Sequence, residues 1–135
     1  MKLFVDTSGW MALYNPRDQF HLRARQAITS LGGQAVQFVT TDYVLDETLM
    51  GLQTRYSGEV ARQFGAWALQ ESNLKLEYLS EEVWQEAWRM FQNYDDQAFS
   101  FTDCASFVLM RQLKLYEAFT FDQHFKQMGF RLWPR

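Results

Sequence analysis

Four acidic residues are the candidates for chemistry in this chain. Asp6 directly follows a short apolar run at the N-terminus, where a charge must be paired, hydrated or bound to a metal. Asp122 follows another apolar run, and Asp103 opens a helix that is predicted to be apolar on nearly every side. The fourth acid, Glu47 or its neighbour Asp46, comes from the middle of a predicted helix.

Carboxylates that converge in one place repel each other, by about 4 kcal/mol for a close pair at roughly 4 Å and an effective dielectric of about 20. Such a cluster raises the pKa values of its members or binds cations. Oxygen ligands suit Mg²⁺ or Mn²⁺ better than zinc, and a bound divalent ion activates water and stabilises charge on a phosphoryl group. The four acids together therefore predict metal-dependent hydrolysis of a phosphodiester.

Each acid also has a purely structural interpretation. Ser100 and Asp103 have the spacing of a capping box, in which the two residues only begin a helix. Asp122 is placed to cap a short helix, and Asp6 to start a loop. Glu47 lies off the apolar stripe of its helix, as a solvated surface residue does, and periodicity does not select it over the acid before it.

Apolar spacing divides the chain into strands that alternate with helices. Strand patterns run over residues 2–5, 36–39, 74–78, 117–121 and 130–133. Helices are predicted to begin near Ser8, Phe20, Thr41, Ser57, Ser80, Ser100 and Asp122, and a polar loop is predicted over residues 93–98. This alternation predicts a single domain, residues 1–135, with a three-layer α/β/α sandwich and a central, mainly parallel sheet. Such sheets bind ligands at the carboxyl ends of their strands, near the point where strand order reverses.

The helix predicted after residue 80 carries large aromatic side chains. Its apolar residues, at helical spacing, are Val83, Trp84, Ala87, Trp88 and Phe91. This stripe predicts a core or dimer contact rather than a cofactor site.

Composition narrows the class of protein. With 47% apolar and 17% aromatic residues, the chain is typical of a globular domain. It has no apolar run near the roughly 20 residues of a membrane helix, and its N-terminus does not resemble a secretory signal. The one cysteine, Cys104, excludes an internal disulfide framework. These features predict a cytoplasmic protein.

The net charge of −3 argues against a broad basic surface for nucleic acid. It does not exclude a nuclease whose acidic site is neutralised by metal ions. The basic residues considered for contact with a phosphate backbone, each also typical of plain surface, are Arg17, Arg23, Arg25, Arg55 and Arg62.

Other catalytic patterns fit poorly. His21 and His124 are far apart and have no cysteine beside them, so a zinc site is not predicted and both are interpreted as surface residues. The sequence contains no G-x-S-x-G elbow and no glycine-rich phosphate loop. The segment after Asp6 is similar to the nucleophile loop of haloacid-dehalogenase phosphatases, but Ser8 stands where their second aspartate would be.

In four segments the chain resembles PIN domains, and most closely VapC-type toxin ribonucleases. The segments are FVDTS at residues 4–8, TDYVLDE at 41–47, SFTDCA at 100–105 and TFDQHF at 120–125. The second segment selects Glu47 over Asp46, which spacing does not do. The resemblance extends from Lys2 to about Trp133. The departure is His124, where relatives often carry a small polar or acidic residue, so a fifth ligand is left open.

The resemblance implies a metal-dependent endoribonuclease, with one or two Mg²⁺ or Mn²⁺ ions in an acidic pocket. Asp6 and Asp103 would be the main ligands, and Glu47 and Asp122 would complete the pocket. The residues expected to orient carboxylates or water are Ser8, Thr102 and Thr120. The resemblance also implies RNA as substrate and an antitoxin that inserts an arginine into the pocket, and the aromatic surplus suggests a homodimer.

Two alternatives from other classes stay open at this point. One is a catalytically silent acidic-pocket module that binds a basic peptide or RNA; the intact acids count against it. The other is a structure-specific DNA nuclease, since the same metal chemistry cuts DNA.

Overall fold

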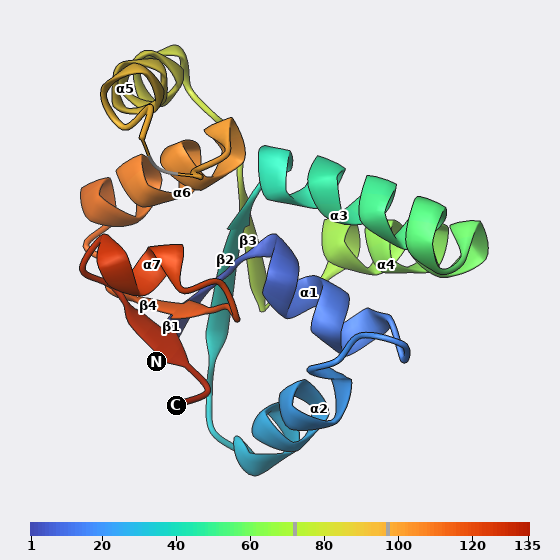
Figure 1. Cartoon of the computed structure of the whole chain (residues 1–135). Coiled ribbons are helices and arrows are strands. Elements are labelled where there is room, and N and C mark those ends of the chain that lie inside the picture. The colour runs from blue at the N-terminus through green and yellow to red at the C-terminus, as the bar shows by residue number, and fades with distance from the viewer. Residues whose placement is uncertain (72, 97) are drawn as a thin grey trace.

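The structure, a computed structural model, describes residues 1–71, 73–96 and 98–135 and has a central sheet with helices on both faces (Figure 1). The sheet has 5 strands, all paired in parallel, in the order β3-β2-β1-β4-β5. The strands are β1 (Lys2–Val5), β2 (Gln37–Thr41), β3 (Leu74–Glu77), β4 (Glu117–Phe119) and β5 (Arg131–Trp133). The prediction of an α/β/α sandwich with a mainly parallel sheet is confirmed.

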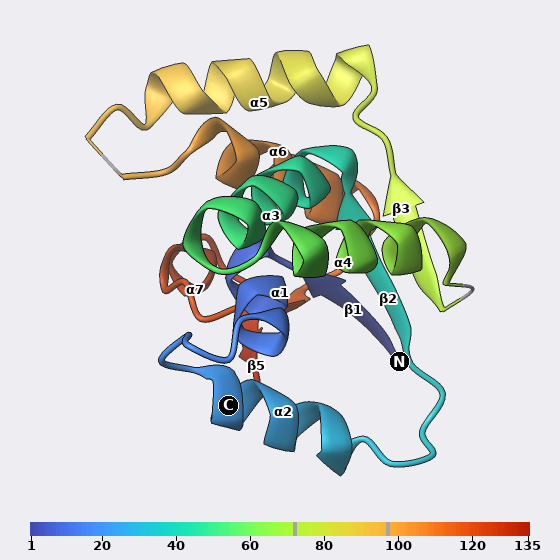
Figure 2. The same ribbon diagram turned by 90° about the vertical axis from the view of Figure 1, so that its right-hand side faces the viewer.

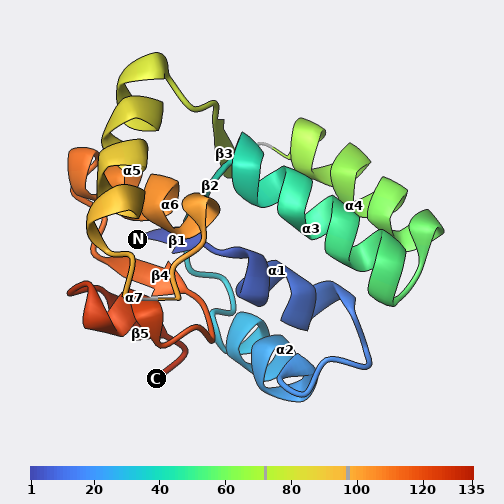
Figure 3. The same ribbon diagram turned by 45° about the horizontal axis from the view of Figure 1, so that its top comes forward.

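Helices from the first half of the chain cover one face of the sheet, and later helices cover the other (Figures 1 and 3). The first group is α1 (Thr7–Tyr14), α2 (His21–Ser30), α3 (Asp42–Arg55) and α4 (Gly58–Gln70). The second group is α6 (Phe101–Gln112) and α7 (His124–Gln127), with α5 (Glu81–Asn93) packed on the outer side of α6 (Figure 2). Right-handed crossovers produce this division, because the chain changes direction across the sheet between β3 and β4.

The two most hydrophobic segments form the centre of the fold. In β1, Leu3, Phe4 and Val5 have no exposed surface, as expected for a strand covered on both faces. Helix α6 buries every residue from Asp103 to Met110, since it lies between the sheet and α5. The prediction of a helix that packs on more than one side is confirmed.

Two helix starts differ from the prediction. Asp6, not Ser8, is the N-cap of α1, and its side chain accepts a hydrogen bond from the Ser8 backbone N–H. The cap of α7 is Gln123 rather than Asp122, although Asp122 Oδ1 accepts from the backbone N–H of His124 at 2.9 Å. In both cases the carboxylate accepts a hydrogen bond from the backbone N–H two residues later.

The aromatic stripe of α5 is not part of the core, which contains only Val83 and Ala87 from this helix. Trp84, Trp88 and Phe91 are 37%, 42% and 39% exposed. The core interpretation of these aromatic residues was therefore wrong for the single chain. The predicted loop at 93–98 begins inside α5 and includes residue 97, which lies outside the described residues.

A close approach between α1 and β4 sets the position of Asp6. A Cβ atom on Gly9 would lie 2.5 Å from the carbonyl oxygen of Phe119, so only glycine fits against this strand. The backbone N–H of Asp6 donates to the same carbonyl at 3.1 Å. These contacts bring the end of β1 against the end of β4.

Across the described part of the chain, the structure has no helix with the length and apolarity needed to span a bilayer.

Candidate active site

Asp6 is the most enclosed of the four predicted acids, with 3% of its surface exposed. Its Oδ2 accepts hydrogen bonds from the hydroxyls of Ser8 and Thr120, both at 3.0 Å. Each hydroxyl in turn accepts from a backbone N–H beyond β4: Ser8 from Phe121 at 2.9 Å, and Thr120 from Asp122 at 3.0 Å. The two hydroxyl oxygens also lie 3.0 Å apart, and together these contacts tie the loop after β4 to the end of β1.

Asp103 has the capping-box geometry that its sequence spacing predicts. Its Oδ2 accepts from the backbone N–H of Ser100 at 3.1 Å, and its own N–H donates to the Ser100 hydroxyl at 3.0 Å. Within the described residues, Oδ1 of Asp103 has no hydrogen-bond partner. The predicted capping box is therefore confirmed, and it leaves one carboxylate oxygen of Asp103 for a ligand.

Asp122 and His124 lie beside Asp103. One ligand atom from each of these three residues lies within 4.8 Å of the other two. His124 Nδ1 is 3.0 Å from Asp122 Oδ1, in a geometry that does not form a hydrogen bond, and the ring packs edge-on against Phe99 at 5.0 Å between centroids. The interpretation of His124 as a plain surface residue was wrong. In the sequence, its position two residues after Asp122 in the same motif indicated that it could lie near the acids.

Glu47 faces the site, and its neighbour Asp46 does not. Glu47 is half-buried on α3, close enough for its charge to raise the pKa of Asp103, whereas Asp46 is exposed. Thr102 is half-buried at the start of α6, but across the described residues its hydroxyl makes no hydrogen bond to a site carboxylate. The predicted orienting contacts are therefore present for Ser8 and Thr120 and absent for Thr102.

The pKa values of two carboxyls record the crowding of negative charge. Burial, together with the charges of Asp103 and Asp122 and against the lowering effect of the two hydroxyls, raises the pKa of Asp6 from its usual 3.8 to about 7. Burial, together with the charges of Asp122 and Glu47 and against the Ser100 hydrogen bonds, raises the pKa of Asp103 to about 6. The four acids thus form one electrostatic unit.

The sheet topology explains why these acids meet. Asp6 follows β1 and Asp122 comes shortly after β4, and these strands are neighbours although most of the chain separates them. This is the switch point of the sheet, where ligands bind in α/β folds. Glu47 reaches it from α3, which follows β2, and Asp103 from the first turn of α6.

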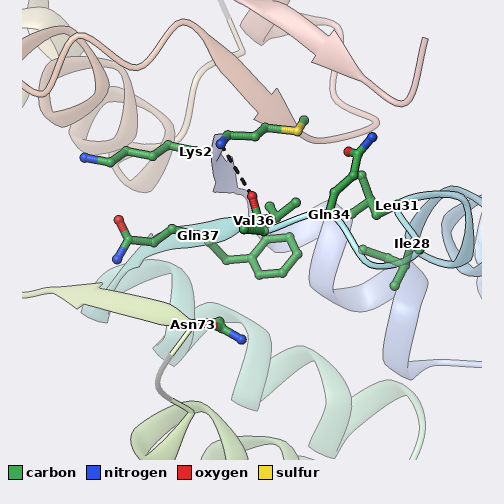
Figure 4. A pocket seen from close by; sticks show the side chains of 11 residues that line it. Lys2, Ile28, Leu31, Gln34, Val36, Gln37 and Asn73 are labelled. Carbon is green, nitrogen blue, oxygen red and sulfur yellow. Dashed lines mark hydrogen bonds between the residues drawn. The ribbon is translucent and has the colours of Figure 1, made fainter.

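A hollow of about 660 Å³ lies at the other end of the strands, where β1, β2 and β3 begin (Figure 4). Its walls include Lys2, Gln37 and Asn73, at or just before the amino ends of β1, β2 and β3. Since none of the four acids lines it, this hollow is not the candidate active site.

The sequence matches the family model of the PIN domain over residues 3–131. The chain belongs to the PIN-domain family. It is 31% identical over 128 residues to the 23S rRNA-specific endonuclease VapC20 of Mycobacterium tuberculosis, with 95% of each chain covered. It is also 27% identical over 127 residues to a VapC ribonuclease of Archaeoglobus fulgidus, with 93% of this chain and 80% of that protein covered.

Two solved structures share this fold. The crystal structure of Mycobacterium tuberculosis VapC20, described as a sarcin–ricin loop cleaving toxin, has a TM-score of 0.87 at 30% identity and covers 95% of each chain. The FitAcB structure from Neisseria gonorrhoeae has a TM-score of 0.64 at 14% identity, covers 98% of this chain and 96% of that one, and shows the fold alone.

The donor atoms of this PIN domain fit a hard divalent cation. Carboxylate oxygens dominate the site, and one imidazole nitrogen lies beside them. Carboxylates with raised pKa values gain most from a cation, because it removes the repulsion that disfavours their charged forms. The residues whose ligand atoms lie close enough together to hold an ion are Asp103, Asp122 and His124. Asp6 and Glu47 are not in this group, although the charges of Asp103 and Asp122 act on Asp6, and that of Glu47 acts on Asp103.

The raised pKa values predict how the metal-free protein responds to pH. Asp6 and Asp103 bind protons in the folded state at pH values where the unfolded chain has lost them, from about 4 up to their pKa values of about 7 and about 6. The free energy of unfolding should therefore fall as pH rises through this window. Denaturant unfolding in EDTA between about pH 5 and pH 8 measures this dependence.

The variant Asp103→Asn is the matched control for this experiment. It keeps an oxygen for the Ser100 N–H and removes one charge, so it should equal or exceed the wild type in stability near pH 8 without metal. A saturating Mn²⁺ concentration, about a hundred times its dissociation constant, should stabilise the wild type by about 2.7 kcal/mol and the variant by much less. If Asp103 only capped α6, the variant would instead lose roughly 0.3–1 kcal/mol and keep the full gain from Mn²⁺.

Proposed function

We propose that this PIN domain, residues 1–135, is a Mg²⁺- or Mn²⁺-dependent endoribonuclease that hydrolyses RNA phosphodiester bonds as the toxin of a toxin–antitoxin pair in the cytoplasm. The observation that carries the proposal is the crowding of acids around Asp103, which lies beside Asp122 and His124, with the pKa of Asp6 raised to about 7 and that of Asp103 to about 6. The similarity to VapC proteins supports RNA as the substrate.

The chain's own residues would prepare the site before RNA binds. Asp6 is oriented by the Ser8 and Thr120 hydroxyls, and Asp103 by the Ser100 backbone N–H, so neither carboxylate needs to reorganise when it meets a cation. A bound divalent ion supplies the acidity of an activated water and neutralises charge on the phosphoryl oxygens. Burial of Asp6 and Asp103 keeps bulk water from screening these charges.

We propose 23S rRNA, in the region of its sarcin–ricin loop, as the substrate to test first. The support is the match to VapC20, a 23S rRNA-specific endonuclease and sarcin–ricin loop cleaving toxin, along 95% of this chain. A catalytically silent binding module would not require this set of acids. DNA of the same sequence, tested beside the RNA, distinguishes a DNA nuclease from a ribonuclease.

Purified protein should cleave a sarcin–ricin loop RNA or intact ribosomes in Mg²⁺ or Mn²⁺, and EDTA should stop the reaction. Primer extension on 23S rRNA identifies the cut, and the same assay on DNA separates the two nuclease classes. Cleavage that continues unchanged in EDTA would rule out the metal mechanism.

Two neighbouring acids provide a matched pair for this assay. Glu47→Gln should lower cleavage by about 10- to 100-fold, because Glu47 contributes to the acidic cluster from α3. Asp46→Asn removes the same charge from the exposed side of that helix and should cleave at the wild-type rate. Equal rates for the two variants would remove Glu47 from the site.

We further propose a homodimer in which the aromatic face of α5 is covered. Trp84, Trp88 and Phe91 form a continuous series, with ring centroids 6.3 Å and 6.1 Å apart, and each is more than a third exposed. Large contiguous aromatic surface favours a protein contact over exposure to water.

Light scattering at micromolar concentration should give twice the 16.0 kDa mass of the chain. The double variant Trp88→Gln/Phe91→Gln should shift the protein towards the monomer, because it replaces exposed aromatic surface and leaves the buried Val83 and Ala87 in place. Tyr78→Gln, at a residue that is 68% exposed outside this stripe, is the control. A monomeric wild type would contradict the dimer.

An antitoxin that inserts an arginine into the acidic pocket is the remaining partner we propose. The planar guanidinium pairs with carboxylates and can replace a cation among crowded acids. Expression of this chain alone should slow growth, and co-expression with the neighbouring gene should relieve the effect. Growth arrest that persists with that gene present would remove it as the antitoxin.

A further inference from the structure

Positive charge gathers around a hollow of about 410 Å³ beside the edge strand β5. Four cationic side chains line it, Arg23 from α2, Lys126 from α7, and Arg131 and Arg135 from β5 and the residues after it. We call this hollow the β5 cation pocket. Among the described residues no Asp or Glu lines it, although the chain as a whole has a net charge of −3. Charge in this protein is therefore segregated.

The β5 cation pocket adjoins the acidic site. A smaller hollow shares Arg23 and Gln123 with the pocket and is also lined by Thr120 and Phe121. Thr120 is the residue whose hydroxyl donates to Asp6 at 3.0 Å. Thr120 therefore links the lining of this smaller hollow to the most buried acid of the site.

Two of the four cations are already held in place. The guanidinium of Arg23 lies over the ring of Phe121, 5.7 Å from its centroid, and also donates to the carbonyl of Pro134 at 3.5 Å. Arg135 lies 3.9 Å from a carboxylate oxygen of Glu117, which offsets part of its charge.

The other two cations have no such neighbour. Among the described residues, Lys126 and Arg131 form no ion pair, and both are exposed. Cations kept close together without a counter-charge raise the local potential and favour a ligand with several negative groups.

We propose that the β5 cation pocket binds phosphate groups of the RNA strand next to the bond that is cut. This inference rests on the proposed ribonuclease function, which makes RNA the polyanion at the adjoining acids. Cationic side chains that contact phosphates fix the register of a strand without reading its sequence. The pocket is thus a positioning site, and it separates strand binding from the metal-dependent step at the acids.

The double variant Lys126→Gln/Arg131→Gln tests the pocket. Its RNA affinity is measured by fluorescence anisotropy with a labelled sarcin–ricin loop RNA in EDTA, so no metal-dependent cleavage is involved. Loss of two phosphate contacts should weaken binding by about tenfold near 0.1 M salt. The slope of log K against log salt concentration should become shallower by roughly 1.4 to 1.8.

The matched control is Lys2→Gln/Lys75→Gln, which removes two exposed lysines of β1 and β3 that line a different hollow, outside the pocket. Both double variants change the net charge equally, so a general electrostatic effect would weaken them alike. Thermal melts of both variants and the wild type show that the fold is kept. The control should retain the wild-type affinity and salt slope.

Equal affinities and equal slopes for the two double variants would overturn the inference, as would an absence of salt-dependent RNA binding by the wild type. If the pocket variant keeps the wild-type RNA affinity but no longer binds an acidic peptide, the pocket is a site for a protein partner. That result would also overturn the inference. In Mg²⁺, the pocket variant should raise KM for cleavage with little change in kcat. Pocket-dependent binding without any cleavage would instead contradict the proposed function, so the two failures are distinguishable.

Discussion

Repulsion among carboxylates that the fold holds together is the constraint on which this site depends. Burial and neighbouring charge raise the pKa of Asp6 to about 7 and that of Asp103 to about 6, although both groups accept hydrogen bonds that stabilise their ionised forms. Hydrogen bonds therefore reduce the free-energy cost of ionising these acids but do not remove it; the donors are Ser8, Thr120 and Ser100. A fold that keeps such an arrangement gives up stability for function, and a cation restores it.

The same few bonds position the site and close the fold. Asp6 ends β1, caps α1 and accepts from the Thr120 hydroxyl at the end of β4. Gly9 allows α1 to press against the carbonyl of Phe119, which also accepts from the Asp6 N–H. The junction of β1 and β4 is therefore both the switch point of the sheet and the support of its most buried acid. A change that loosens this junction should affect stability and geometry together.

Local sequence patterns predicted most of the fold, because most strands and helices form for reasons contained in a few neighbouring residues. Composition predicts the buried strands and the apolar helix α6, and spacing alone predicts the Ser100–Asp103 capping box. Caps next to strand ends were harder, because Asp6 and Ser8 are both good capping residues and only the close packing of α1 on β4 decides between them. The spacing of the stripe on α5 left a core and a dimer contact open, and the exposure of Trp84, Trp88 and Phe91 excludes only the core.

What the sequence could not predict depends on contacts between distant segments. His124 seemed to be a surface residue until the loop after β4 brought it beside Asp103, and the β5 cation pocket joins residues from α2, α7 and β5 that no spacing relates. Choosing Glu47 over Asp46 needed the family motif, although the structure gives the physical reason, which is that only Glu47 faces the other acids.

Separating negative from positive charge allows a site of this kind to bind both a metal ion and a polyanionic substrate. An acidic cluster attracts a divalent ion but repels a polyanionic substrate, and this repulsion reaches about 10 Å at ordinary ionic strength. A basic surface spread over the whole protein would weaken the cluster's hold on the metal, since nearby positive charge opposes cation binding. Four cations confined to the far side of Thr120 can attract RNA phosphates while Asp6 stays within its own shell of hydroxyl donors. A chain with a net charge of −3 can thus meet the demands of metal and nucleic acid at adjoining places.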